Sequence, residues 1–470
     1  MPWYQAPPVE NYWGWHWTMN HFDPEVIAQN SQRSIASQYY PLTGPYDSRD
    51  IDILEYHVLL MKLAGIDGVI VDWYGMKDYN DYAVLHESTS DLFSYVKDAG
   101  LEFSICYEDR TIKSMVDNNH FTPTQALDHG GEVMKFLQNN WFDEDCYVKL
   151  NNQPLLLSWG PTYFKSNANW VSMFSEIDPK PMLFTLDNKL FESATGAYPW
   201  PPMHLSKNGI LKTIDLNLYL TQFYQKSNSW DFLVATAFPG FNDIYEEAGL
   251  HDSYGFLDPA DGVTFRSTLN IAMNYNPDIL QLATWNDFGE GTVIEPTVEF
   301  GFSYLEEVQK LRKEKIDTTF DYDLDELELA FSIYQLRKEY EDDYDVHDQL
   351  YDAYYHIING EIEEAKAIVY SLRPNAIENE KLSGEFYVSS AYPNPFNPTT
   401  SFEIRIPEKS NVSVSIFDIK GNLIDQKSNQ NYSEGLNYFE WKAYRFSTGI
   451  YFIQFQYENF VKVKKIVLMK

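Results

Sequence analysis

Between residues 50 and 312, short apolar runs alternate with segments whose apolar residues recur at helical spacing. The helical patterns cover residues 50–65, 87–99, 124–141, 168–177, 213–224, 264–275 and 300–313. The runs between them have the length and the β-branched or aromatic content of buried strands. These strand candidates are DGVIVDWYG, LEFSICYED, PLLLSWGP, PMLFTLDN, TGAYPW, FLVATAFPG and ILQLATWND, and PWYQA at residues 2–6 is a candidate for a truncated first strand.

This alternation predicts an α/β fold with parallel strands, for which two architectures compete. The first is a closed (β/α)8 TIM barrel over residues 1–312, and the second is an open doubly wound sheet. The open sheet is disfavoured because no glycine-rich phosphate loop follows an early strand. Polar or aromatic residues instead recur where successive strands end, and a barrel gathers such positions on one face. They are Asp72–Trp73–Tyr74, Glu108–Asp109, Trp159, Asp187 and Asn286–Asp287.

Residues 313–380 have a different pattern, that of acidic amphipathic helices forming an extension or a linker. The run from Asp321 to Asp325 is similar to the start of a calcium-binding loop. Such a loop needs glycine at its sixth position and glutamate at its twelfth, where this chain has Glu326 and Ser332. We therefore do not expect calcium there.

Residues 381–470 alternate apolar and polar positions with a period of two, as in half-buried antiparallel strands. Val412, Val414 and Ile416 alternate with serines, for example. This part of the chain is predicted to be a separate small β-sandwich.

The composition says more about the possible binding partners than about the fold. The 69 acidic and 35 basic residues give a formal net charge of −34, which phosphate groups would repel, so nucleic acid is excluded. Aromatic residues make up 16% of the chain, and flat amphipathic rings are suited to stacking on sugars. No apolar run of 18 residues predicts a membrane span. Cys106 and Cys146 fall at opposite ends of neighbouring strands, which favours two free thiols over a disulfide.

The segment TWNDFGEGTVIEP, at 284–296, carries the strongest candidate chemistry. Asp287 and Glu290 are three positions apart, and Gly289 and Gly291 make a turn easy, so the two carboxylates can converge. A carboxylate pair is the usual equipment for cleaving a glycosidic bond, with one acid and one base. The alternative is that the two acids only cap a loop. Because the pair follows the last barrel strand, we give the catalytic pair and the loop cap about equal weight.

Two further carboxylates are expected at the barrel mouth. Ser104, Cys106 and Glu108 share the smaller, more polar face of their strand, which favours the barrel interior and would place Glu108 in the mouth. A surface pairing with Arg110 is the alternative. Asp72 is similarly placed, and its alternative role is to cap the helix that follows.

The segment NYWGWHWTMNHFDP concentrates aromatic rings near the N-terminus. Trp13, Trp15 and Trp17 alternate as on a strand or an extended loop, so they form either a sugar-stacking wall or an aromatic plug over the barrel end. His16 and His21 have no cysteine or carboxylate at ligand spacing, so no zinc site is expected. No G-x-S-x-G motif provides for serine-hydrolase chemistry. No cofactor or metal is predicted.

Four of these motifs together resemble the related glycoside hydrolase families 99 and 71, barrel enzymes that act on α-linked mannans and α-1,3-glucans. They are PWYQAP with WGWHW, DGVIVDWYG, FPGFND at 238–243, and WNDFGEGTVIEP, and the resemblance covers roughly residues 1–312. It implies that Asp287 is the base and Glu290 the acid. Together with the strand-end positions and the N-terminal aromatic segment, it leads us to expect substrate contacts from Trp3, Tyr4, Trp15, His16, Trp17, Asp72, Trp73, Tyr74, Glu108, Trp159, Trp285 and Asn286.

The final motif combines features of both families. Trp285 to Gly289 follow the family 71 pattern, whereas Gly291, Thr292, Ile294 and Glu295 follow that of family 99. In family 99 the base deprotonates the substrate's own 2-hydroxyl, which then acts as the nucleophile. Asp287 is one methylene shorter than the glutamate of family 99, so activation of a water molecule competes with that route.

The C-terminal segment resembles the sorting domain of the bacterial type IX secretion system. The resemblance rests on Tyr392–Pro398, Gly421, Gly449–Tyr451 and the basic tail. It implies a secreted or cell-surface protein that engages the secretion machinery. No basic region followed by an apolar stretch occurs at Met1, so we expect that a leader peptide is missing from this chain.

The sequence thus favours a secreted glycoside hydrolase that acts on an α-linked oligo- or polysaccharide, an α-mannan or an α-glucan. The first alternative is a non-catalytic surface protein that binds glycans on the same barrel. A structural adhesin displayed by its sorting domain is the second.

Overall fold

The computed structural model describes residues 1–28, 31–372, 387–388, 391, 396–406, 409–433, 435–457 and 460–468. The chain divides into two compact units, residues 1–365 and 366–470. The predicted boundaries of the barrel, the helical extension and the sandwich, 1–312, 313–380 and 381–470, stay a prediction.

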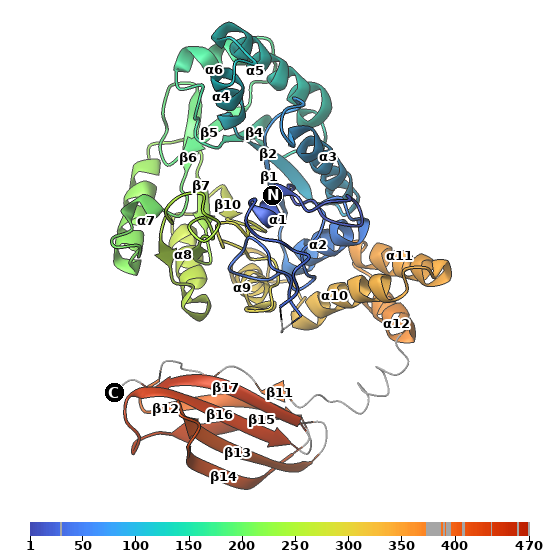
Figure 1. The fold of residues 1–470 in the computed structure, drawn as a ribbon, viewed down its shortest axis with the longest axis vertical. Helices are drawn as coiled ribbons and strands as arrows, with labels where there is room; N and C mark the ends of the chain where they lie inside the picture. The colour runs from blue at the N-terminus through green and yellow to red at the C-terminus, as the bar shows by residue number, and fades with distance from the viewer. Residues whose placement is uncertain are drawn as a thin grey trace. The chain divides into compact units, whose positions relative to one another are not determined.

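The first unit is an α/β barrel, which confirms the predicted fold class. Five strands form a parallel sheet in the order β1 (Gly68–Trp73), β2 (Glu102–Tyr107), β4 (Gln153–Ser158), β5 (Met182–Leu186) and β6 (Ala194–Tyr198). A short β3 (Lys149–Leu150) adds to β4 in the antiparallel sense. β7 (Val234–Ala237) and β10 (Ile279–Leu282) form a further parallel pair. All seven strand candidates after residue 50 therefore occur, arranged around the centre of the unit (Figure 1).

Helices surround these strands (Figure 1), and all but the one at Arg110–Asp117 correspond to predicted helical segments. They are α2 (Ile51–Ala64), α3 (Tyr82–Asp98), α4 (Arg110–Asp117), α5 (Pro123–Leu137), α6 (Asn167–Met173), α7 (Thr213–Ser227), α8 (Val263–Met273) and α9 (Ser303–Leu311). Local sequence sets their ends. Asp50 caps the N-terminus of α2 by accepting from the backbone N–H of Asp52, and Gly65 ends that helix with φ 78°. Thr122 and Gln125 form a capping box at the start of α5.

The N-terminal segment differs from its prediction. Residues 2–6 form no strand, and the prolines at 2, 7 and 8 lack the N–H groups that a strand ladder needs. Trp15–Thr18 is a short helix, α1, so Trp13, Trp15 and Trp17 do not alternate on a strand. Among the described residues no ladder joins β10 to β1. Tyr4 instead forms hydrogen bonds with Ser48, which precedes α2, and with Asn286, which follows β10.

Three helices follow the barrel as predicted, α10 (Leu324–Glu339), α11 (Tyr344–Ile358) and α12 (Ile362–Leu372). The acidic run before α10 has a structural role. Asp323 and Glu326 form a capping box, in which the Asp323 N–H donates to the Glu326 carboxylate over 2.8 Å. Arg337 of α10 pairs with Glu55 of α2 at 2.6 Å, and both side chains are buried.

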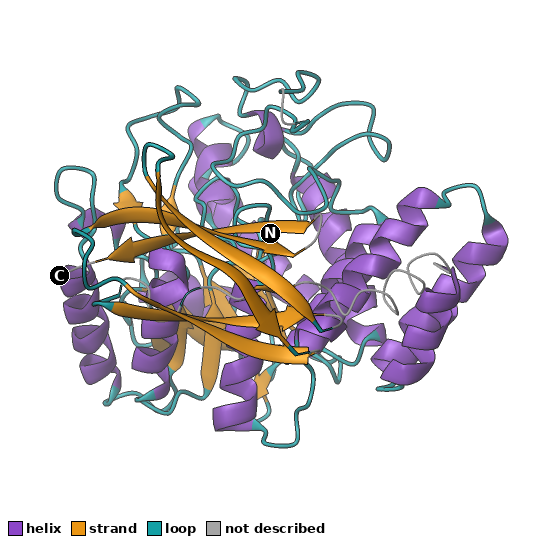
Figure 2. Ribbon diagram, turned by 90° about the horizontal axis from the view of Figure 1, so that it is seen from below, coloured by secondary structure: helices purple, strands orange, loops and turns teal. Residues whose placement is uncertain are grey.

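The second unit is built from antiparallel strands, which are prominent in Figure 2. One sheet has the order β11 (Tyr387–Val388), β12 (Thr399–Ile406), β15 (Gly435–Lys442). The other has the order β14 (Leu423–Tyr432), β13 (Ser410–Asp418), β16 (Gly449–Tyr457), β17 (Phe460–Leu468). Val412, Val414 and Ile416 are all 0% exposed, as the alternating pattern predicts. The predicted β-sandwich is confirmed.

Cys106 and Cys146 are free thiols, as expected. Within the described part of the chain, no helix combines the length and the apolar character that a membrane span requires.

Candidate active site

The turn that follows β10 brings Asp287 and Glu290 together. The backbone N–H of Glu290 donates to Oδ1 of Asp287 over 3.0 Å, and the N–H of Asp287 donates to Oγ1 of Thr284 over 2.8 Å. Gly291 has φ 63°, and a Cβ there would lie 2.5 Å from the carbonyl oxygen of Asn242. Only glycine fits this position. The glycine-rich spacing therefore produces the convergent turn that the sequence predicts.

A neighbouring loop, which contains the FPGFND motif, fixes the back of this turn. The N–H of Asn242 donates to the carbonyl of Glu290 over 2.9 Å, and the N–H of Ile244 donates to that of Gly289 over 3.0 Å. On the other side, the Tyr4 hydroxyl donates to the carbonyl of Asn286 over 2.9 Å. Backbone bonds from both sides leave the two carboxylates little freedom to separate.

The two carboxylates differ in environment. Burial raises the pKa of Asp287 to about 6, although the backbone N–H groups of Glu290 and Gly289 oppose this shift by binding the carboxylate. Burial also raises the pKa of Glu290 well above its usual value, and the charge of Asp287 raises it further. For Glu290 both causes favour the protonated form, whereas the backbone N–H groups at Asp287 favour the ionised form. Such a pair can supply one acid and one base.

A cavity of about 1550 Å³ opens at these carboxylates. It exceeds the roughly 300–1,000 Å³ of ordinary small-molecule pockets. Its lining is strongly aromatic: the Trp159 and Trp200 rings meet edge to face at 4.6 Å, and Trp3 stacks on His16 at 4.2 Å. Of the predicted site residues, the cavity is lined by Trp3, Trp15, His16, Asp72, Tyr74, Glu108, Trp159, Trp285, Asn286, Asp287 and Glu290.

Two more carboxylates face the cavity from β1 and from the end of β2. Asp72 has an Oδ1 atom that is buried without a hydrogen-bond partner among the described residues, and burial raises its pKa to about 7. Burial and the charge of Asp72 raise the pKa of Glu108. Arg110 lies 3.8 Å from Glu108 but is itself 70% exposed, so this pairing is weak. Asp72 caps no helix, since α3 begins after Asp81.

Three predicted site residues lie outside the cavity lining. Trp73 alternates with Asp72 on β1, and its ring packs against Phe136 and Trp141. Trp17 is 0% exposed and donates its indole N–H to the carbonyl of Tyr46. Tyr4 is 1% exposed and binds the backbone of the turn that carries Asp287 and Glu290. For Trp73 and Trp17 the period of the strand or helix turns the ring into the core, whereas Tyr4 lies in an irregular segment.

Two cavity residues that interact with the carboxylate pair, Trp200 and Tyr245, were not among the predicted site residues. Trp200 points its indole N–H at Oε2 of Glu290 over 3.4 Å, and it follows β6 as Trp159 follows β4. Extending the strand-end rule to β6 would have identified it. Tyr245 follows the FPGFND motif, and burial and the charge of Asp287 raise its pKa. No periodic signal marks that position.

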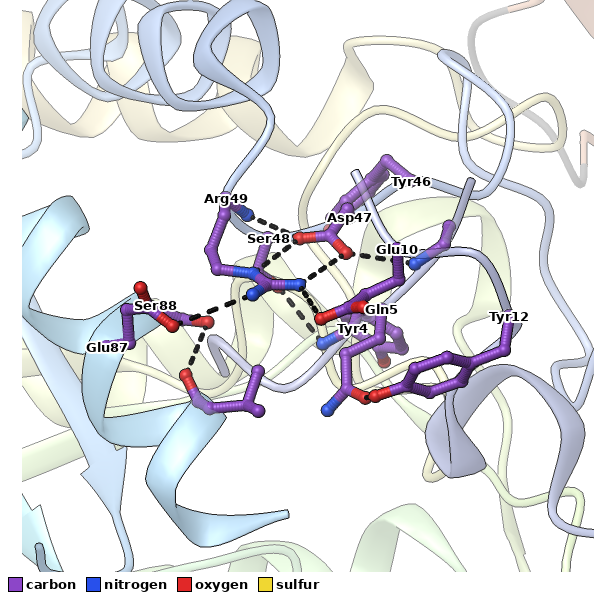
Figure 3. A network of polar contacts seen from close by, with 12 residues as sticks. Tyr4, Gln5, Glu10, Tyr12, Tyr46, Asp47, Ser48, Arg49, Glu87 and Ser88 are labelled. Carbon is purple, nitrogen blue, oxygen red and sulfur yellow. Dashed lines mark hydrogen bonds and ion pairs between the residues drawn. The ribbon is translucent and has the colours of Figure 1, made fainter. Parts of the chain in front are cut away.

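A polar network holds the N-terminal aromatic segment at the cavity edge (Figure 3). Asp47 accepts from the N–H of Ala6 over 3.0 Å and from the Arg49 guanidinium. Arg49 also pairs with Glu10 at 2.7 Å. The Tyr12 hydroxyl donates to Gln5 over 2.7 Å. These bonds anchor the irregular segment that carries Trp3, Trp15 and His16.

Across the described residues, no group of three or more histidine, cysteine, aspartate or glutamate side chains is arranged to hold a metal ion.

Fold and site together define a class, an α/β-barrel protein with an aromatic cleft that is lined by carboxylates. Comparison with known proteins shows which members of this class the chain is similar to. The chain is 23% identical over 330 residues to a glycoprotein endo-alpha-1,2-mannosidase-like protein of Danio rerio, covering 63% of this chain and 69% of that protein. It is 28% identical over 327 residues to a glycoprotein endo-alpha-1,2-mannosidase of Mus musculus, with 63% and 66% covered.

Among solved structures, the GH99 endo-alpha-mannosidase from Bacteroides thetaiotaomicron aligns with a TM-score of 0.49 and 19% identity, covering 67% of this chain and 94% of that one. Residues 390–469 match the family model of the secretion system C-terminal sorting domain. The chain thus joins a region similar to the endo-α-mannosidases of glycoside hydrolase family 99 to a type IX sorting domain. It is a secreted or cell-surface bacterial protein.

Proposed function

We propose that the barrel region is a glycoside hydrolase that cleaves an α-linked mannan or glucan. The observation that carries this proposal is the Asp287–Glu290 pair, held on one turn at the barrel mouth and with pKa values that favour different protonation states. Glycosidic cleavage needs an acid and a base that act on one bond, and this turn supplies both.

In this proposal Glu290 is the general acid, because its carboxyl group is the one that keeps its proton. It protonates the leaving oxygen of the scissile bond. Asp287 is the base and takes a proton from the nucleophile, either the sugar's own 2-hydroxyl or a water molecule. Asp72 and Glu108 accept hydrogen bonds from sugar hydroxyls, and the unpartnered Oδ1 of Asp72 is suited to this role.

An α-linked mannose polymer is the first substrate to test, because the similar animal proteins are named as endo-α-1,2-mannosidases. The aspartate in the position of the family base keeps α-1,3-glucan as the second. The purified chain should release reducing ends from one polymer of an α-mannan and α-glucan panel. The anomer of the first product, read by NMR, reports whether water or the 2-hydroxyl attacks.

The second candidate function is glycan binding without hydrolysis. It is favoured by the shorter Asp287, whose carboxylate reaches less far than a glutamate would. Affinity for a polymer on the panel without product release, even after prolonged incubation, would support this alternative. Release of product that is absent from Asp287→Asn and Glu290→Gln would exclude it.

A further inference from the structure

A buried chain of polar side chains runs from helix α2 to the catalytic turn. The side-chain N–H of Asn286 donates to the Tyr46 hydroxyl over 2.9 Å, and that hydroxyl donates to Oε2 of Glu295 over 2.7 Å. The other oxygen of Glu295 lies 3.3 Å from Nε2 of His57, which belongs to α2. Asn286 immediately precedes Asp287, so the chain ends next to the base.

All four members of this chain are almost completely buried. The exposed fractions are 4% for Asn286, 5% for Tyr46, 1% for Glu295 and 6% for His57. No ion pair between Glu295 and a lysine or arginine occurs among the described residues. Its side-chain hydrogen bond there comes from Tyr46, while the His57 ring lies beside its other oxygen without a hydrogen bond. Burying a carboxylate away from a strong cation destabilises a fold.

The buried carboxylate of Glu295 lies next to the turn, and its contacts order that turn. The N–H of Glu295 donates to the carbonyl of Trp285 over 2.9 Å, so the carboxylate and the turn are joined by backbone as well. The His57 ring meets the Trp285 ring edge to face at 5.5 Å. Helix α2 is a buried 14-residue element and provides a rigid support for a site that lies on a loop.

We infer that Glu295, Tyr46 and His57 are positioning residues that hold Asn286, and with it the carboxylate of Asp287, in its place at the barrel mouth. None of the three has a role as acid or base in this scheme. The predicted effect of these residues on the reaction rate rests on the proposed function. Their predicted effect on the order of the turn does not. A displacement of about 1 Å at a reacting group is enough to cost on the order of 100-fold in rate.

The test that needs no substrate is hydrogen exchange of the segment 284–295 in the full chain. Tyr46→Phe removes one hydroxyl and keeps the ring, so it should speed amide exchange in this segment about tenfold while the strands of the barrel keep their protection. Tyr224→Phe is the matched control. Its buried hydroxyl donates to the carbonyl of Thr236 on β7, and its loss should leave 284–295 unchanged. Unchanged exchange in Tyr46→Phe overturns the inference.

The second experiment measures kinetics on whichever polymer the wild-type chain cleaves. Tyr46→Phe and Glu295→Ala should lower kcat about 10- to 100-fold with KM within about twofold, and Glu295→Gln should recover part of that loss because its side-chain oxygen still accepts from Tyr46. Loss of the N–H contacts from Gly289 and Glu290 to Asp287 should also move the acidic limb of the pH profile of kcat/KM to higher pH. The other titratable groups around Asp287 include the Met1 amino group, Tyr4, Asp72, Tyr245 and Glu290, all of which both variants retain.

The two failures are distinct. If the wild-type chain cleaves no polymer, the proposed function fails while the exchange experiment still decides the inference. If the wild-type chain is active and both variants keep its kcat and its pH profile, the inference is wrong and the proposed function stands. Should Glu295→Ala not fold, Tyr46→Phe gives the same reading with less disturbance of the core.

Discussion

Glu290 donates its backbone N–H to the carboxylate of Asp287 over 3.0 Å, so the acid of the proposed pair helps to set the pKa of its base. The bond stabilises the ionised form of Asp287 and opposes the effect of burial. The charge that Asp287 then carries raises the pKa of Glu290. Within the four-residue turn from Asp287 to Glu290, one contact lowers the pKa of Asp287 and the charge of Asp287 raises the pKa of Glu290.

The first prediction concerns pH. The profile of kcat/KM should be bell-shaped, since the base must be ionised and the acid protonated. The acidic limb should lie near pH 6, where Asp287 titrates, and the alkaline limb should lie higher, set by Glu290. Asp72→Asn removes the other cavity carboxylate with a raised pKa of about 7. The acidic limb should persist in that variant. Its disappearance would assign the limb to Asp72.

The second prediction links the site to stability. The pKa of Asp287 rises from 3.8 to about 6 on folding, so folding favours the protonated form, and the associated stability is lost as pH rises through this range. Asp287→Asn abolishes that dependence. It should therefore raise Tm by several degrees at pH 8, with about 3 kcal/mol as the upper limit, and change Tm little at pH 4. Thermal unfolding at both pH values checks this, and a lower Tm at pH 8 contradicts it.

The third prediction tests the turn itself. Gly291→Ala places a Cβ 2.5 Å from the carbonyl oxygen of Asn242. It also forces a φ of 63° on a residue that has a side chain. The turn must shift, so kcat should fall by at least tenfold, and stability by about 1–3 kcal/mol. Gly249→Ala is the control, because Gly249 has φ 69° but nothing within 4 Å of a Cβ. Equal loss of activity in both variants would attribute the effect to backbone strain alone.

The fourth prediction concerns the support of α2 by α10. Arg337→Met leaves Glu55 buried without its partner at 2.6 Å and should lower the free energy of unfolding by about 3–5 kcal/mol at pH 8. Burial already raises the pKa of Glu55 to about 7, so the loss should be smaller at pH 5, where the group is protonated. Adding Glu55→Gln should restore part of the stability at pH 8. A loss that is independent of pH would mean that packing of the arginine stem, and not its charge, is what matters.

Most of the barrel could be predicted from the sequence because each strand is a compact apolar run between amphipathic helices. The pair Asp287 and Glu290 was also visible, since glycines on both sides of Glu290 indicate a tight turn. Periodicity is a local signal, however. It placed Trp17 and Trp73 among the substrate contacts, whereas the actual direction of each ring depends on the element that carries it.

The residues that sequence reasoning missed act over long separations in the chain. Glu295 reaches Tyr46, which is 249 positions away, and Trp200 reaches Glu290, which is 90 positions away. Neither contact has a spacing that could be recognised in the sequence. The acidic run at Asp323 is the opposite case, because its capping box with Glu326 is local and matches a known helix-start pattern.

The most direct test of the central claim separates acid from base by the leaving group. Fluoride leaves an α-glycosyl fluoride with little need for protonation, whereas the oxygen of a departing sugar hydroxyl must be protonated. Glu290→Gln should lose about 100- to 10,000-fold in kcat/KM on the natural glycosidic bond but keep most of its activity on the matching fluoride, and Asp287→Asn should lose both. Equal loss on the two substrates in Glu290→Gln, or full activity in Asp287→Asn, would contradict the assignment of Glu290 as acid and Asp287 as base.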